Sequence, residues 1–258
     1  MSSEGNEMSF WDHLEVLRGT LFRSILAILI FTVVFLSIKG PLFKMVLWPT
    51  SEDFILYKML HLPFKMDLIN IDVSAQFFVH LKVSVLAAVV IAFPYIIWEI
   101  WRFVSPALYD NEKKAVGKAF GMSSGLFYLG AAIGYFVVLP VCLMFFMNYT
   151  VSDDVANTIS LNSYISLFVS MVFLIGLIFE FPTVVVVLSS LGILTKDHLR
   201  KYRKHAFVVI LILAAFITPS DPVSMFVLAV PLYALYEFSI LMCKKGEPED
   251  EEETETAE

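Results

Sequence analysis

Six long apolar stretches limit what this chain folds into more than any other feature of its sequence. A helix needs about 20 residues to cross the roughly 30 Å of hydrocarbon in a bilayer. The stretches that approach or exceed this length are residues 20–39, 78–104, 115–147, 163–191, 205–218 and 222–243. The composition agrees, because 58% hydrophobic residues in a chain of 258 carry more apolar surface than one soluble core buries. The sequence therefore predicts an all-α, polytopic integral membrane protein with six transmembrane helices.

The fifth stretch, residues 205–218, is the shortest. At 1.5 Å per residue its roughly 14 residues span only about 21 Å, so an interfacial helix is the alternative interpretation. Basic residues precede this stretch, and none follows it in the turn TPSDPVS. Because lysine and arginine are retained on the cytoplasmic side of a membrane, this asymmetry favours a true crossing.

The distribution of lysine and arginine also orients the whole bundle. Basic residues flank the inner end of the first stretch, lie in the loops after the second and fourth, and follow the sixth. Fewer lie in the other loops, so both chain ends are expected in the cytoplasm. The first stretch follows a polar segment and has no small-residue cleavage site, which predicts a permanent span rather than a cleaved signal.

Three regions are predicted along the chain. Residues 1–19 form a cytoplasmic amphipathic helix, residues 20–243 a six-helix transmembrane domain, and residues 244–258 an acidic disordered tail. Within the transmembrane domain, the proline-containing and partly apolar segment 40–77 is expected to cap the external face. The tail holds eight of the 25 acidic residues, so the formal charge of −7 does not describe the rest of the chain. This charge balance predicts no nucleic-acid partner.

The first predicted helix has two faces. Its apolar residues recur at helical spacing, and its charged residues share the other side. The apolar set is Phe10, Leu14, Leu17 and Leu21, and the charged set is Asp12, Glu15 and Arg18. The helix is expected to lie at the inner membrane surface and to run into the first span. The ordinary interpretation of such a charged face is simple solvation.

Glu180 interrupts a run from Tyr164 to Leu194 that otherwise contains no charge. A carboxylate near the middle of a membrane helix costs on the order of 2.5 to 3.5 kcal/mol, so such residues usually face a cavity or a partner. We predict that Glu180 is an intramembrane polar site on a concave, water-accessible surface. The alternative is a carboxyl hydrogen-bonded to a neighbouring helix, which only holds the bundle together. Pro182 is expected to bend the helix beside it.

Catalytic motifs are few and weak. GMSSG at residues 121–125 fits G-x-S-x-G, but it lies in an apolar helix, where close helix packing explains small residues better. The sequence contains no H-E-x-x-H, no phosphate-binding glycine loop and no clustered metal ligands. We therefore predict no enzyme, no cofactor and no metal. Two alternatives stay open: an ion-coupled secondary transporter that uses Glu180, and an intramembrane serine protease that uses Ser123 or Ser124.

Several segments, in order over about residues 9–243, resemble the TatC family, whose members are the multi-span core subunit of the twin-arginine protein translocase. The matching segments are HLEVLR at 13–18, FVSPALYDNEKK at 103–114, LFYLGAAIGYFVVLP at 126–140, FEFP at 179–182, GILTKDHLRKYRKHA at 192–206 and TPSDPVS at 218–224. The family has six spans with both ends inside, which agrees with the topology predicted above.

The resemblance implies a receptor for folded precursor proteins whose signal peptides carry paired arginines. It implies the cytoplasmic (inner) membrane of a prokaryote, contact with membrane lipid, an oligomeric complex with single-span TatA/TatB-type subunits, and transport driven by the proton-motive force. In the family, acids of an HLxELR-like segment and of the loop after the second span form the signal-peptide site, and these match Glu15 and Glu112. The other signal-peptide residues implied are Arg18, Phe103, Pro106, Leu108 and Tyr109. The family's intramembrane acid matches Glu180, and Glu99 stands where the family often has Gln.

Overall fold

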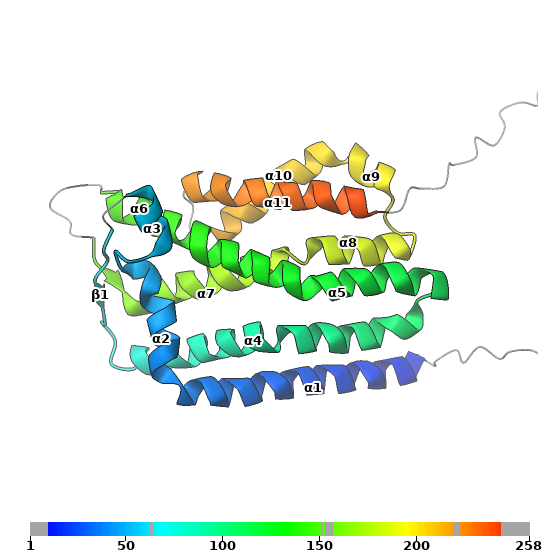
Figure 1. Ribbon diagram of the computed structural model, residues 1–258, viewed down its shortest axis with the longest axis horizontal. Coiled ribbons are helices and arrows are strands. Elements are labelled where there is room, and N and C mark those ends of the chain that lie inside the picture. The colour runs from blue at the N-terminus through cyan, green and yellow to red at the C-terminus, as the bar shows by residue number, and fades with distance from the viewer. Residues whose placement is uncertain (1–9, 62–63, 151, 153–156, 219–221, 244–258) are drawn as a thin grey trace, which may run out of the picture.

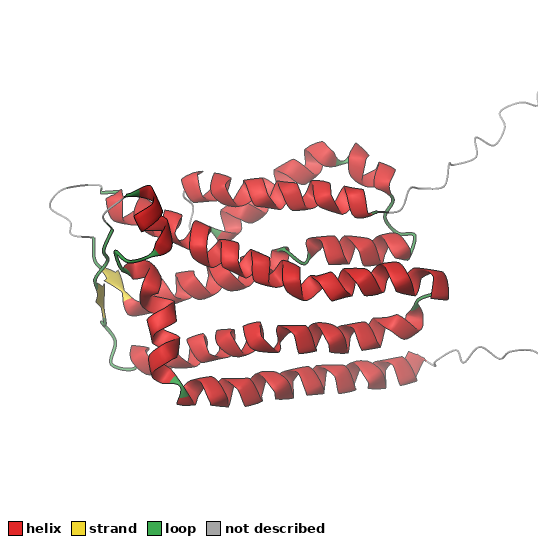
Figure 2. Cartoon of the chain, in the orientation of Figure 1, coloured by secondary structure: helices red, strands yellow, loops and turns green. Residues whose placement is uncertain are grey.

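The computed structural model describes residues 10–61, 64–150, 152, 157–218 and 222–243, most of which are helical (Figure 2). The helices are α1 (Phe10–Ser37), α2 (Lys39–Leu47), α3 (Ile55–Leu60), α4 (Ala75–Val104), α5 (Asp110–Ile133), α6 (Leu139–Asn148), α7 (Leu161–Ile178), α8 (Phe181–Ser190), α9 (Lys196–Lys201), α10 (Arg203–Ile217) and α11 (Pro222–Met242). The shorter elements are η1 (Trp48–Thr50), η2 (Ser105–Ala107), the π-helical turn η3 (Gly134–Val138) and the strands β1 (Leu68–Ile69) and β2 (Ile159–Ser160).

The long helices run along the long axis of the molecule (Figure 1). Among the described residues, five stretches of helix are long and apolar enough to cross a membrane: Leu14–Ser37, Ala75–Val104, Lys113–Asn148, Leu161–Ser190 and Pro222–Met242. The predicted polytopic helical membrane protein is thereby confirmed. Helix α10 has only 15 residues, which span about 22 Å, so the sixth crossing stays a prediction.

Helix α1 continues without a break across the boundary predicted between residues 19 and 20. The amphipathic segment and the first span are therefore one element, and the depth of its first turns stays a prediction. The start of α1 and the end of α11 lie at the same end of the bundle (Figure 1). The predicted acidic tail, residues 244–258, lies outside the described residues.

Two prolines shape the helices that surround Glu180. Helix α7 ends at Ile178, and α8 begins at Phe181 with Pro182 in its first turn, so the predicted bend is confirmed. Pro140 is the second residue of α6, which begins where the π-helical turn η3 ends. Because proline has no N–H to donate, the backbone hydrogen bonds rearrange beside it.

Close contact between α5 and α7 depends on three glycines. A Cβ on Gly130 would lie 2.8 Å from the carbonyl oxygen of Ile175, and one on Gly134 would lie 2.9 Å from that of Met171. From the other side, a Cβ on Gly176 would lie 2.9 Å from the Phe127 ring. The packing role expected for GMSSG is wrong for its glycines, because a Cβ on either Gly121 or Gly125 would have no neighbour within 4 Å.

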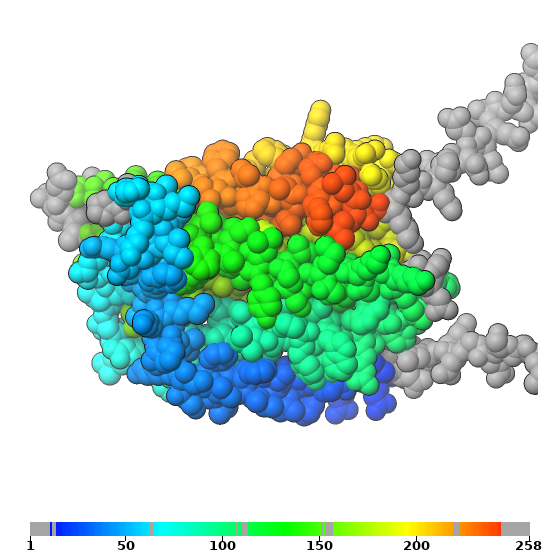
Figure 3. Space-filling model, viewed as in Figure 1, coloured from blue at the N-terminus to red at the C-terminus, as the bar shows by residue number. Residues whose placement is uncertain are grey.

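The segment between α1 and α4 folds across the end of the bundle opposite the chain ends (Figures 1 and 3). Phe54 and Tyr57 are buried within it. Burial raises the pKa of Tyr57, whose hydroxyl donates a 3.0 Å hydrogen bond to the Pro49 carbonyl. This cap, residues 39–74, is joined to the rest of the chain by parallel pairing of β1 with β2, in which Leu68 lies opposite Ile159.

Two tyrosines of the bundle also hold the cap. The Tyr135 hydroxyl donates to the Met45 carbonyl at 2.7 Å, and the Tyr164 hydroxyl donates to the Val46 carbonyl at 2.6 Å. Buried tyrosines need a partner for the hydroxyl, and backbone carbonyls in the last turn of α2 supply it. The end of the bundle is therefore closed by specific polar contacts as well as by apolar burial.

Candidate functional site

The turn between α4 and α5 lies at the end of the bundle where α1 begins and α11 ends (Figure 1). Leu108 is buried against Val116 and Phe120, so it anchors the turn. The neighbouring Tyr109 is 77% exposed, and Pro106 is exposed as well. Five of the predicted site residues lie on this turn or beside it, and the buried leucine holds the exposed ones in place.

The first turns of α1 and α5 lie at this same end, with the end of α4 between them (Figure 1). Glu15 and Arg18 are exposed on α1, and neither forms an ion pair within the described part of the chain. Phe103 is half-buried near the end of α4. Glu112 lies in the first turn of α5, but its side chain is outside the described residues. The structure thus places the predicted positions on one surface without fixing the geometry between the two carboxylates.

Glu99 forms a charged cluster that links α4 to α1. The Arg23 guanidinium donates to Glu99 Oε2 from Nε at 2.9 Å and from Nη2 at 2.7 Å. The Tyr95 hydroxyl donates to the other carboxylate oxygen at 3.1 Å. Glu99 is 1% exposed, so its charge is removed from solvent and paired within the chain. The sequence singled out Glu99 but gave no sign of this partner, which lies 76 residues away.

Glu180 lies at the break between α7 and α8, where it is 8% exposed. The hydroxyl of Ser123, a buried residue of α5, donates a hydrogen bond to Glu180 Oε2. The other carboxylate oxygen of Glu180, Oε1, is buried and forms no hydrogen bond of ordinary geometry with the described residues. The expected exposure on an open, water-accessible surface is wrong, because Glu180 bridges helices inside the bundle.

The same contact bears on the two alternative functions. Ser123 Oγ donates to a carboxylate, whereas a serine nucleophile needs a base such as histidine beside it. The described histidine side chains lie on other elements, at His61, His80, His198 and His205. Within the described ranges no three His, Cys, Asp or Glu side chains are grouped so that they could hold a metal. The geometry therefore does not favour a protease. Glu180, the residue that a transporter would use, is hydrogen-bonded to a hydroxyl inside the bundle.

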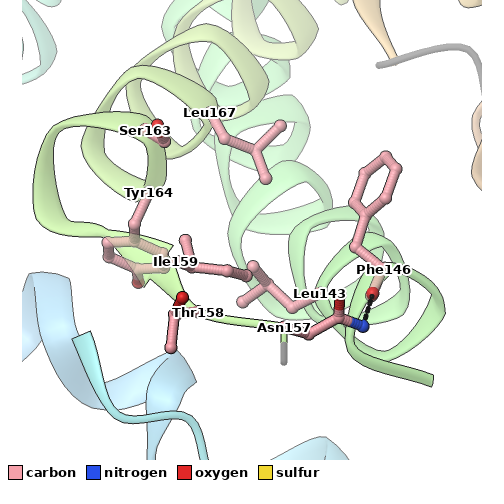
Figure 4. A pocket seen from close by; sticks show the side chains of 8 residues that line it. All are labelled: Leu143, Phe146, Asn157, Thr158, Ile159, Ser163, Tyr164 and Leu167. Atoms are coloured by element: carbon pink, nitrogen blue, oxygen red, sulfur yellow. Dashed lines mark hydrogen bonds between the residues drawn. The ribbon is translucent and has the colours of Figure 1, made fainter. Parts of the chain in front are cut away.

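A separate hollow of about 410 Å³ lies at the cap end of the bundle (Figure 4). Its lining is Leu143, Phe146, Asn157, Thr158, Ile159, Ser163, Tyr164 and Leu167. The Asn157 amide donates to the carbonyls of Phe146 and Tyr149, at 3.4 and 3.0 Å, and so ties Asn157 to the end of α6. No titratable side chain other than the buried Tyr164 lines it, so we assign it no chemistry.

Comparison with known proteins decides the family. The family model for "Sec-independent protein translocase protein (TatC)" matches residues 12–231. The chain belongs to the TatC family. A TatC of Blattabacterium sp. subsp. Periplaneta americana is 34% identical over 256 residues, covering 93% of this chain and 96% of that protein. A TatC of Helicobacter pylori (strain J99) is 40% identical over 185 residues, covering 72% of this chain and 74% of that protein.

A solved structure agrees with the TatC assignment. A crystal structure described as the twin-arginine translocase receptor TatC in DDM superposes with a TM-score of 0.74 at 32% identity, covering 90% of this chain and 99% of that chain. The resemblance stated from the sequence is thus confirmed, and so is its consequence that this chain is a membrane-embedded subunit of the Sec-independent translocase.

One detail of the TatC pattern differs in this chain. In HLxELR the glutamate directly precedes the LR pair, whereas HLEVLR has Val16 at that position and Glu15 one residue earlier. Adjacent residues on a helix point about 100° apart. The Glu15 carboxylate therefore projects from a different side of α1 than the family pattern predicts.

Proposed function

We propose that this TatC-family chain is the receptor subunit for twin-arginine signal peptides, and that the peptide binds across the start of α1 and the α4–α5 turn. The observation that carries the proposal is an exposed carboxylate, Glu15, which forms no ion pair with the described residues and lies at the same end of the bundle as the turn beside Glu112. That end is cytoplasmic by the distribution of basic residues. A signal peptide arrives there before it is transported.

The chemistry of arginine explains why carboxylates are suitable receptors. A guanidinium is a planar fork that stays charged and binds a carboxylate through two parallel hydrogen bonds, whereas lysine is a point charge. Two adjacent arginines therefore match two carboxylates. In this proposal Phe103, Pro106 and Tyr109 contact the peptide, Arg18 borders the site, and Leu108 supports the turn from beneath.

In this proposal the chain does no covalent chemistry itself. We infer that it works in an oligomeric complex with single-span TatA/TatB-type subunits, in contact with membrane lipid, and that the proton-motive force drives transport. The exposed apolar residues of α10 and α11 are the surface we assign to a single-span partner. The three most exposed of them are Phe216 at 85%, Leu241 at 71% and Val230 at 70% exposure.

Peptide binding to the purified chain tests the receptor role. Replacing Glu15 or Glu112 by Ala should weaken binding of a twin-arginine peptide by about 1.5 to 3 kcal/mol, the range for a hydrogen bond to a charged group. Glu52→Ala is the matched control, because Glu52 is exposed on the cap at the opposite end. A double Glu15 and Glu112 variant that binds twin-arginine and twin-lysine peptides as the unmodified chain does would refute the proposal.

A further inference from the structure

We propose that Glu99 is an additional arginine-binding carboxylate for the signal peptide, and that Arg23 is the chain's own arginine, which occupies it until a peptide arginine takes its place. The inference rests on the proposed receptor function and deepens it. To the carboxylates at Glu15 and Glu112 it adds a buried third site, which a peptide arginine reaches by displacing Arg23.

The geometry shows directly which chemistry this site accepts. Glu99 Oε2 receives two hydrogen bonds from one guanidinium, at 2.9 and 2.7 Å, while Tyr95 donates to Oε1 at 3.1 Å. The carboxylate is 1% exposed and its orientation is fixed from both sides. Two neighbouring nitrogens of one guanidinium donate to the same carboxylate oxygen, and an ammonium, which has a single nitrogen, makes only one such contact.

The Arg23 side chain both occupies this site and covers it from solvent. This side chain is 41% exposed, while the carboxylate beneath it is almost wholly buried. Gly19, one turn earlier on α1, leaves the space for the guanidinium, because a Cβ there would lie 3.2 Å from Arg23 Nη1. Movement of one flexible side chain would therefore open Glu99 without moving a helix.

Glu15, Gly19 and Arg23 follow one another at intervals of four residues, so they share one face of α1. Eight residues of helix separate Glu15 from Arg23, a rise of about 12 Å. Adjacent residues of an extended peptide point in opposite directions. Two long arginine side chains that diverge in this way suit one carboxylate on α1, Glu15, and a second on α4, Glu99, which lies beside Arg23.

The site is also reachable from the cytoplasmic surface. The 30 residues of α4 rise about 45 Å, which exceeds the roughly 30 Å hydrocarbon core. Glu99 precedes the end of α4 by only about five residues, or roughly 7.5 Å of helix. Trp98 is 52% exposed and Tyr95 37% exposed beside it, as is typical of aromatic residues at the membrane interface.

Arg23 could act as an internal ligand of the site or as a structural latch between α1 and α4, and the two roles predict different changes in peptide affinity when Arg23 is removed. If Arg23 occupies a peptide site, its side chain lowers the fraction of chains that are ready to bind, so its loss raises apparent affinity. If the ion pair only fastens α1 to α4, its loss loosens the receptor, and affinity falls or stays the same. The sign of one measurement therefore separates the two roles.

The experiment measures fluorescent twin-arginine and twin-lysine peptides on the full chain in detergent. Arg23→Ala should raise twin-arginine affinity at least about threefold, and adding Glu99→Gln should abolish that gain. Glu99→Gln alone should weaken twin-arginine binding about threefold, which tests the site even if Arg23→Ala fails to fold. Arg102→Ala is the charge control. Arg102 is an exposed arginine near the end of the same helix, α4, and its guanidinium carbon lies over Trp98, 5.8 Å from the ring centroid.

Each outcome decides between the hypotheses. If Arg23→Ala lowers or does not change twin-arginine affinity, or if Glu99→Gln alone has no effect, the inference about Glu99 is wrong. An equal gain in Arg102→Ala would also overturn it, because the gain would then reflect net charge. In all these cases a loss of binding in Glu15→Ala leaves the receptor function standing. Equal binding of both peptides to the unmodified chain would instead reject the receptor function itself.

Discussion

Ser123 and Glu180 show how a single hydroxyl supports a carboxyl inside an apolar bundle. Glu180→Gln keeps a side chain that accepts the Ser123 hydrogen bond, so we expect it to retain part of the export activity. Glu180→Ala removes the polar group and is expected to stop export while the chain still inserts and binds peptide. Export of a precursor into membrane vesicles and peptide binding are measured side by side on both variants.

The partner residue supplies the control for this prediction. Ser123→Ala leaves a buried carboxyl oxygen unpaired and should lower the free energy of unfolding by about 1 to 3 kcal/mol. Ser124→Ala, at the less buried neighbouring position, should change it by less than about 0.5 kcal/mol. Full export by Glu180→Ala would reduce Glu180 to a packing residue, and joint loss of folding and binding would assign it a purely structural role.

At the scale of elements, the crossing of α5 and α7 sets the shape of the bundle. Gly130→Ala would place a Cβ 2.6 Å from Phe179 Cγ and 2.8 Å from a backbone oxygen, which cannot move aside as a side-chain tip does. We expect a loss of about 1 to 3 kcal/mol in the free energy of unfolding, the cost of overpacking. Thermal unfolding in detergent, monitored by circular dichroism, measures it.

Gly125 on the same helix is the matched control. A Cβ there meets nothing within 4 Å, and alanine is the better helix former by up to about 1 kcal/mol. Gly125→Ala should therefore be neutral or slightly stabilising. If both alanine variants unfold at the same temperature as the unmodified chain, the close contact at Gly130 is not a constraint on the fold.

At the scale of the whole molecule, α10 is shorter than the five stretches of helix that are long enough to cross a membrane. Its 15 residues span about 22 Å, so the bilayer beside it must thin or another chain must cover it. We predict that a single-span partner docks there. Cysteines introduced at Phe216 or Met225 should crosslink to partner subunits. A cysteine at Val33, which is 64% exposed on α1, is the control, and crosslinks confined to α1 and α4 would contradict the prediction.

The order and approximate ends of the long helices could be predicted from the sequence, because hydrophobic length and proline position are local properties. Residues 78–104 and 163–191 were expected as spans, and the structure has helix over Ala75–Val104 and Leu161–Ser190. The TatC family was also predictable, from motifs such as HLEVLR. The pairing of Arg23 with Glu99 was not, because nothing local links two residues on different helices.

The candidate site was predicted as a set of positions rather than as a geometry. Glu15 and Tyr109 are exposed, as a peptide-binding role requires, whereas Leu108 is buried and supports the turn. Exposure within a motif depends on which neighbour covers each side chain, and the motif does not contain that neighbour. For the same reason the glycines of GMSSG suggested a close helix contact that Gly130, Gly134 and Gly176 make instead.

The cap is fastened by residues that are synthesised long after it. Tyr164 reaches back 118 residues to Val46, and Tyr135 reaches back 90 residues to Met45. Strand β1 likewise cannot pair until β2 has been synthesised. A growing chain therefore exposes an unfastened cap until the α7 segment has been inserted, and closing it requires several helices to be in their correct places. Closure of the cap is thus a late step in biogenesis that completes only in correctly assembled molecules, which makes protease resistance of this segment a natural measure of maturation.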